Sequence, residues 1–187
     1  MSSRGRLLVF AAPAGTGKST IISRLRERHP AWGFSCSATT RSPRPGEQDG
    51  RDYYFLSRDE FLRRVRAGEF FEHEDVHGEL YGTLKTPTLT RLEAGETLIF
   101  DLDVKGALSV KAGFPAALTI FILPPSLAAL RERLVKRSTE PPELIERRLR
   151  RVDLEMQYAE RFDHRVVNDD LERAVDEVES IVARGFG

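Results

Sequence analysis

The sequence predicts an α/β protein with a parallel sheet, helices on both of its faces, and a small mixed α+β lobe inserted into it. Short apolar segments alternate with amphipathic helical segments over most of the chain, and this alternation is typical of parallel sheets. Between residues 39 and 85 the alternation gives way to proline- and glycine-rich turns and short strand-like pieces. We therefore predict a core formed by residues 1–38 and 86–187 and a lobe formed by residues 39–85.

The composition fits one compact unit and gives no overall charge that would attract a polyanion. The 187 residues carry 29 basic and 29 acidic side chains, so the formal net charge is +0 and a basic site must be local. The single cysteine, Cys36, cannot form a disulfide within the chain, which fits a reducing compartment. No apolar run is long enough to cross a membrane, and the first apolar segment begins too early for a signal peptide. We expect a cytoplasmic protein with no nucleic-acid partner and no membrane partner, and we leave open whether it is a monomer or a homo-oligomer.

The chain is predicted to begin with a strand, a loop and a helix. Apolar residues 7–10 form the strand, and the apolar positions within 21–25 give the helix a buried face. The pair His29-Pro30 ends this helix because proline cannot continue it. Trp32 and Phe34 are expected to return to the core.

The lobe is predicted to combine short strands with one helix. A turn and a strand occupy residues 50–55, and a capping box at 57–60 starts a helix that Gly68 closes. Strand-like pieces at 70–73 and 80–83 flank a turn and lack helical spacing.

After the lobe, strands and helices alternate again. Pro87 is placed as the first residue of a helix, and Asp170 is placed as the cap of the last one. The predicted strands are 97–100, 118–123 and 166–168, and the predicted helices are 87–95, a segment around 107–110 ending near Gly113, 127–137, 143–158 and the segment after Asp170.

The loop after the first strand has the pattern of a P-loop. Gly15 and Gly17 allow backbone N–H groups to converge, and Lys18 and Ser19 stand where the helix begins, so a nucleotide polyphosphate is the predicted ligand. Ala12 departs from the pattern because it occupies the place of the first glycine. The residues predicted to bind the donor nucleotide are Ala12, Pro13, Ala14, Gly15, Thr16, Gly17, Lys18, Ser19 and Thr20.

A pair of aspartates follows the strand at 97–100. Ligands of open α/β sheets bind beyond the carboxyl ends of the strands, so Asp101 and Asp103 are expected at the same cleft as the P-loop. They could handle a metal ion together with the hydroxyl of Ser19. Alternatively, Asp103 caps the next helix and Asp101 is solvated. Alternate residues of a strand point in opposite directions, so both are not expected to be ligands.

The lobe offers groups for a second, phosphate-bearing nucleotide. Arg41 and Arg44 can hold phosphate oxygens through their guanidinium forks, with Tyr53 and Tyr81 as hydroxyl donors. The carboxylate of Glu72 can accept from two neighbouring N–H groups, which is what the Watson–Crick edge of guanine presents. Ser37 and Thr83 are short polar groups that could join it.

In their order, these motifs resemble the guanylate kinase family over nearly the whole chain. The matching segments are the P-loop and residues 37–44, 50–53, 71–72, 81–83, 101–103 and 167–170. Besides Ala12, the sequence departs from the family at Lys105, where the family usually has glutamine.

The resemblance implies a P-loop kinase core and the reaction ATP + GMP ⇌ ADP + GDP, with Mg²⁺ accompanying ATP and Ser19 as its protein ligand. It implies that Lys18 contacts the donor phosphates and that Asn168 lies near adenine. It also implies a helical lid at about 133–150, whose Arg133, Arg137 and Arg148 close over the transferring group and act in catalysis with Lys18, Arg41 and Arg44. The residues it implies at GMP are Ser37, Arg41, Arg44, Tyr53, Glu72, Tyr81, Thr83, Asp101 and Asp103.

Two other functions remain compatible with these residues. A P-loop kinase of the same build could act on another phosphorylated acceptor, such as a ribose bisphosphate, and Glu72 would then have no guanine to read. A module without catalysis could bind a phosphopeptide through the acceptor-site arginines, although the intact Lys18-Ser19 pair argues against it.

Overall fold

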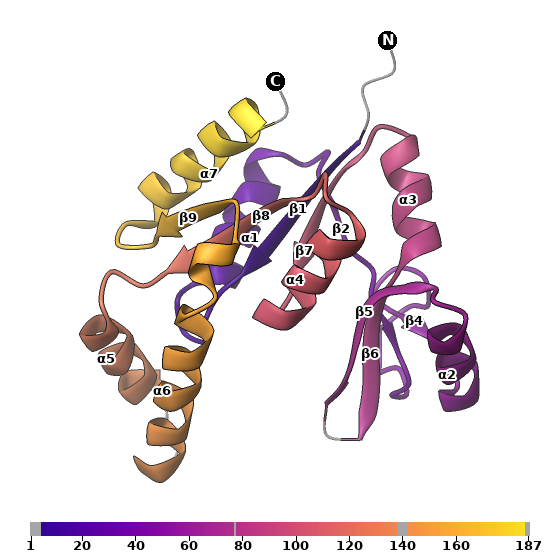
Figure 1. Cartoon of the computed structure of the whole chain (residues 1–187), viewed down its shortest axis with the longest axis horizontal. Helices are drawn as coiled ribbons and strands as arrows, with labels where there is room; N and C mark the ends of the chain where they lie inside the picture. Colours follow the sequence, from indigo (N-terminus) through magenta and orange to yellow (C-terminus); the bar gives the residue numbers. More distant parts are fainter. Residues whose placement is uncertain (1–4, 77, 138–141, 186–187) are drawn as a thin grey trace.

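The fold contains two sheets, as Figure 1 shows for a computed structural model that describes residues 5–76, 78–137 and 142–185. The larger sheet has five strands in the order β2-β7-β1-β8-β9, and every neighbouring pair is parallel. This confirms the predicted α/β class. The strands are β1 (Arg6–Ala11), β2 (Gly33–Phe34), β7 (Thr97–Asp101), β8 (Leu118–Leu123) and β9 (His164–Val167).

Helices cover both faces of the parallel sheet (Figure 1). Alternate residues of β1 point to opposite faces, so Leu8 and Phe10 pack with α1 (Lys18–Arg28) and α7 (Leu171–Gly185). Leu7 and Val9 pack on the other side with α4 (Val104–Gly113) and with Leu92 of α3 (Lys85–Glu93). Apolar burial on both faces explains why this strand reads as one continuous hydrophobic run.

The smaller sheet forms a separate layer with the order β4-β3-β6-β5. Its β3–β4 pair is parallel and its other pairs are antiparallel. A small core of its own includes Phe61, which stacks on Phe70 with ring centroids 4.5 Å apart. The elements of this layer are β3 (Ala38–Thr39), β4 (Tyr54–Phe55), α2 (Arg58–Arg66), β5 (Phe70–Val76) and β6 (Glu79–Leu84).

The helices α5 (Leu127–Arg137) and α6 (Pro142–Met156) project from the parallel sheet as a pair (Figure 1). Leu130 and Val152 form a small buried contact between them. A short 3₁₀ helix, η1 (Ala159–Arg161), then leads into β9.

Two differences between the expected elements and the structure have a clear physical reason. α3 begins at Lys85, two residues before Pro87, because the first turn of a helix needs no hydrogen bond from the proline nitrogen. Phe34 does not return to the core: its exposed fraction is 37%, because β2 is a two-residue edge strand and the ring lies under Arg26 instead. Trp32 does pack against the core and stacks on His29.

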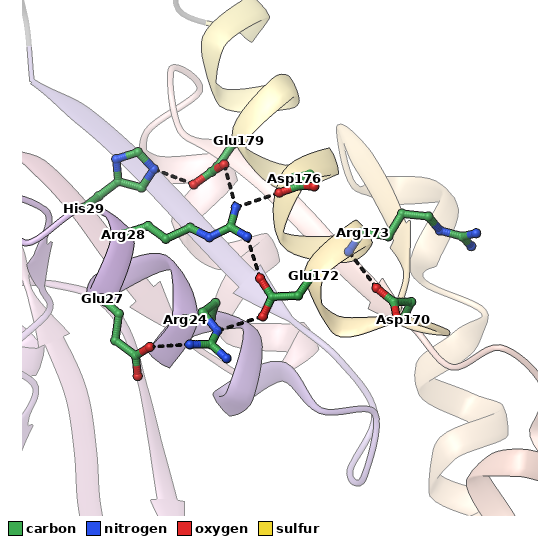
Figure 2. A network of polar contacts seen from close by, with 9 residues as sticks. All are labelled: Arg24, Glu27, Arg28, His29, Asp170, Glu172, Arg173, Asp176 and Glu179. Carbon is green, nitrogen blue, oxygen red and sulfur yellow. Dashed lines mark hydrogen bonds and ion pairs between the residues drawn. The ribbon is translucent and has the colours of Figure 1, made fainter.

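An ion-pair network joins the end of α1 to α7 (Figure 2). Arg28 donates to Asp176 at 2.6 Å, to Glu179 at 3.0 Å and to Glu172 at 2.5 Å. His29 also contacts Glu179, with 2.7 Å between Nε2 and Oε1. The network thus attaches the C-terminal end of α1 to α7, and the P-loop lies at the opposite, N-terminal end of α1.

Candidate active site

The predicted P-loop wraps the N-terminal end of α1. Gly15 and Gly17 have φ angles of 85° and 90°, which residues with a Cβ rarely adopt. The hydroxyl of Thr16 donates to the carbonyl of Pro13 at 3.0 Å and fixes the curvature of the loop. Ala12 is accommodated because its side chain packs against the apolar cluster under α1. Among the described residues no side chain caps α1, so backbone N–H groups of the loop and the first helical turn stay available to an anion, and we call this arrangement the anion cradle.

A cavity of about 690 Å³ lies over this cradle. Its lining consists of residues 12–20 together with Asp101, Leu102, Asp103, Arg151, Val152 and Glu155. All nine residues predicted to bind the donor nucleotide from the loop therefore face one space.

Lys18 lies at the floor of this cavity. Its Nζ is 2.5 Å from Oδ1 of Asp101 and donates to the carbonyl of Leu102 at 2.7 Å. Asp103 has a different part, because it caps α4 by accepting from the N–H of Gly106 at 2.7 Å. The capping interpretation thus holds for Asp103, whereas Asp101 is paired with the P-loop lysine.

A second cavity of about 260 Å³ lies between the two sheets. Its lining consists of Ser37, Tyr53, Glu72, Glu74, Tyr81, Gly82, Asp101, Leu102 and Asp103. Residues 101–103 belong to both linings, so the two cavities meet at the carboxyl end of β7. The structure brings together most of the side chains that the sequence indicated for the acceptor.

Glu72 is a half-buried carboxylate of the second cavity. Its Oε1 accepts from the hydroxyl of Thr83 at 2.6 Å, which orients the carboxyl group and leaves Oε2 for another donor. Burial raises the pKa of Glu72 above the usual value of a glutamate, and the carboxylates of Glu74 and Asp103 act in the same direction.

Arg41 is held by a carboxylate that sequence reasoning missed. Its NH1 and NH2 each donate to Glu47 at 2.7 Å, and its guanidinium carbon lies 4.8 Å from the ring centroid of Tyr53. The Arg41 guanidinium and the backbone N–H of Arg44 lower the pKa of Glu47 to about 2. The side chain of Arg44 is exposed. The only sequence signal for Glu47 was its place in the same loop, three residues after Arg44.

The helices α5 and α6 contribute one arginine that was not expected. Arg151 lines the P-loop cavity and donates to Glu155 at 2.8 Å. Its position four residues before Glu155 marks a helix ion pair, so the sequence suggested a surface role only. The side chains of Arg133, Arg137 and Arg148 lie outside the described residues.

Asn168 approaches the P-loop from the end of β9. It is 8% exposed, and its Nδ2 donates to the carbonyl of Thr16 at 2.7 Å. The lining of the P-loop cavity includes Thr16 and Gly17 but not Asn168.

The described part of the chain shows neither a cluster of metal ligands nor a membrane-spanning helix. No cluster of three or more His, Cys, Asp or Glu side chains there is arranged to hold a metal ion. No helix in the same part is long and apolar enough to cross a membrane.

Comparison with known proteins gives consistent matches along the chain. The family model described as guanylate kinase matches residues 4–184. The guanylate kinase of Gloeobacter violaceus is 54% identical over 177 residues, which cover 95% of this chain and 86% of that protein. The guanylate kinase of Chlorobaculum tepidum is 49% identical over 181 residues, covering 96% and 93%. A crystal structure of guanylate kinase from Anaplasma phagocytophilum has a TM-score of 0.71 and 32% identity, covering 98% of this chain and 87% of that one.

Proposed function

This chain belongs to the guanylate kinase family, and from that premise we propose that it transfers the γ-phosphoryl group of ATP to GMP, giving ADP and GDP. One observation carries the proposal. The anion cradle with Lys18 and the cavity with Glu72 share the floor formed by residues 101–103, so a donor in one and an acceptor in the other can meet end to end.

ATP would occupy the larger cavity. The glycine-rich loop and the N-terminus of α1 present backbone N–H groups to the polyphosphate. The ammonium of Lys18, which in this structure contacts Asp101 and the Leu102 carbonyl, lies within the same cavity and would turn toward the transferring phosphoryl group. Residues 12–20 fit this role because all of them line that cavity.

GMP would occupy the smaller cavity. Glu72 would accept from the two adjacent N–H groups of guanine, with Thr83 orienting its carboxylate and Ser37 on the same wall. The phosphate would lie near Arg41, Tyr53 and Tyr81, with Arg44 reaching it from the loop. Asp101 and Asp103 lie between the base and the donor site.

The chemistry asks the chain mainly for alignment and for neutralisation of charge. Phosphoryl transfer needs no covalent intermediate when the acceptor oxygen is held in line with the donor. Mg²⁺ bound with ATP would add positive charge at the phosphates, and the hydroxyl of Ser19 in the first turn of α1 fits it as an oxygen ligand. The lid arginines Arg133, Arg137 and Arg148 belong to the proposal as groups that close over the reacting phosphoryl group.

Closure of α5 and α6 over the cradle would also exclude water, which would otherwise accept the phosphoryl group. Arg151 and Glu155 already reach the donor cavity from α6. We also propose the cytoplasm as the place of the reaction, since the single cysteine fits a reducing compartment.

A coupled assay for ADP formation with GMP, dGMP, AMP, UMP and CMP as acceptors tests the proposal. We expect turnover with GMP and dGMP and at least about a hundredfold lower kcat/KM with AMP, because adenine has an acceptor nitrogen where guanine has the ring N–H beside its amino group. Robust turnover with AMP and none with GMP would contradict the proposal. Phosphopeptide binding without ADP formation would identify a module without catalysis.

A further inference from the structure

We propose that Asn168 is a positioning residue of the P-loop, which aims the backbone N–H of Gly17 into the anion cradle. The inference rests on the proposed function, since it describes how the ATP site is held in shape. The contact that carries it joins the amide of Asn168 to the carbonyl of Thr16, 152 residues away in the sequence.

The direction of this hydrogen bond is fixed by chemistry. A backbone carbonyl only accepts, so the amide must present its NH₂ group to Thr16, and the distance from Nδ2 to the carbonyl oxygen is 2.7 Å. Asn168 is itself anchored, because its backbone N–H donates to the carbonyl of Leu123 at 2.8 Å, just after the last paired residues of β8 and β9. The loop is thus tied to the rigid sheet through one side chain.

The hydrogen bond to the Thr16 carbonyl also sets the direction of the next backbone N–H, that of Gly17. The peptide between Thr16 and Gly17 is planar and trans, so its C=O and N–H groups point in opposite directions. Asn168 does not line the P-loop cavity, whereas Thr16 and Gly17 do. Because the carbonyl points to Asn168, away from the cavity, the N–H of Gly17 points toward the cavity and toward an incoming phosphate.

Gly17 gives a second, independent sign of the same arrangement. Its φ is 90°, and a Cβ placed on it would lie 2.4 Å from Nδ2 of Asn168. The Asn168 amide therefore packs so close to the backbone of residue 17 that no side chain larger than that of glycine fits there. The side chain of Thr16 is 1% exposed, and its hydroxyl holds the preceding part of the loop by donating to the carbonyl of Pro13.

The variant Asn168→Asp tests the inference because it keeps the shape and reverses the hydrogen bond. As a carboxylate, the new side chain meets the Thr16 carbonyl with no donor, and the loop must move. Once protonated, it can donate again. We expect ATP binding measured by calorimetry to be weaker than in the wild type by about tenfold near pH 8, and by less than about threefold near pH 5.5, since burial raises the pKa of a carboxyl group.

Two further variants separate orientation from stability. Asn168→Ala should bind ATP about tenfold more weakly at both pH values, because it has no proton to regain. Val178→Ala, in the fully buried core contact of α7, should lower the Tm and leave the ATP affinity unchanged. The neighbouring Asp169 does not disturb the pH readout, because the backbone N–H of Asp170 lowers the pKa of Asp169 below its usual value.

Equal ATP affinity of Asn168→Asp and the wild type near pH 8 would overturn the inference, and so would a loss that does not recover near pH 5.5. If the wild type itself bound no ATP, the proposed function would fail together with the inference. Wild-type binding combined with an unaffected variant would remove the inference alone.

Discussion

Replacing Glu72 by glutamine tests the central recognition step of the proposed GMP site. The substitution keeps size and shape, and the bond from Thr83 at 2.6 Å can persist to the amide oxygen. The other carboxylate oxygen becomes an NH₂ group that would face an N–H donor of guanine. The change therefore removes one charge-assisted hydrogen bond and leaves a buried donor without an acceptor.

The expected loss follows from these two effects. A hydrogen bond to a charged group contributes about 2 kcal/mol and an unpaired buried donor costs about 1 kcal/mol more, which together amount to roughly a hundredfold. We expect kcat/KM for GMP to fall by about this factor. Stability should move in the opposite direction: burial raises the pKa of Glu72, so its ionised form destabilises the fold at neutral pH, and Glu72→Gln should have an equal or higher Tm.

The assay is coupled ADP formation with GMP and with IMP, which lacks the 2-amino group of guanine. The ratio of kcat/KM for GMP to kcat/KM for IMP should shrink in the variant, because GMP loses a contact to its 2-amino group that IMP never makes. Glu69→Gln, which removes a charge from the same lobe outside both cavities, serves as the control. A GMP kcat/KM within about threefold of the wild type would refute the assignment of Glu72 to guanine.

Four other predictions follow from the same contacts. In the wild type, kcat/KM for GMP should fall as the pH is lowered, with a midpoint above the usual glutamate pKa, because the raised pKa of Glu72 makes this carboxylate take up a proton at a higher pH. A midpoint at the ordinary glutamate pKa would contradict this prediction. Lys18→Ala should lower kcat/KM at least about a hundredfold with the fold retained by circular dichroism, and near-normal turnover would exclude Lys18 from the donor site. Gly17→Ala should abolish ATP binding in calorimetry, since a Cβ would lie 2.4 Å from the Asn168 amide, and normal affinity would contradict that geometry. Arg28→Ala should lower the Tm, and the difference from the wild type should shrink as salt rises because exposed ion pairs are screened; a difference independent of salt would exclude the network in Figure 2 as its cause.

The parts of the fold that could be predicted are those that depend on neighbouring residues in the sequence, such as apolar runs, helix periodicity and helix caps. The parallel sheet was visible in continuous apolar runs, and the predicted helix 127–137 has the bounds of α5. One half of the expected capping box is present, because the hydroxyl of Ser57 accepts from the N–H of Glu60, whereas the Glu60 carboxylate bonds to Arg63 and Arg64 instead. Phe34 could not be placed, since its exposure depends on β2 lying at the edge of the sheet. The division into residues 39–85 and the remainder stays a prediction.

The candidate site divides in the same way. Lys18 and the loop glycines belong to a short motif whose spacing indicates phosphate binding, and Glu72 was placed at guanine by the resemblance to the family. Glu47 and Arg151 were missed because a carboxylate in a loop and an arginine on a mixed-charge helix look like ordinary surface residues. Only the folded chain shows that the Arg41 guanidinium donates two hydrogen bonds to Glu47 and that Arg151 lines the P-loop cavity.

Strand register explains why the two cavities share one floor. Phe10 of β1 pairs with Asp101 of β7, so the P-loop leaves its strand beside that aspartate. On the other side of β7, Phe34 of β2 pairs with Ile99, and the N–H of Ser35 donates to the same Ile99 at 2.9 Å. The chain then needs only two more residues to bring Ser37 alongside residues 101–103, where it enters the lobe. A parallel order of β2-β7-β1 therefore forces the donor loop and the acceptor lobe to meet at Asp101, whatever the length of the lobe between them.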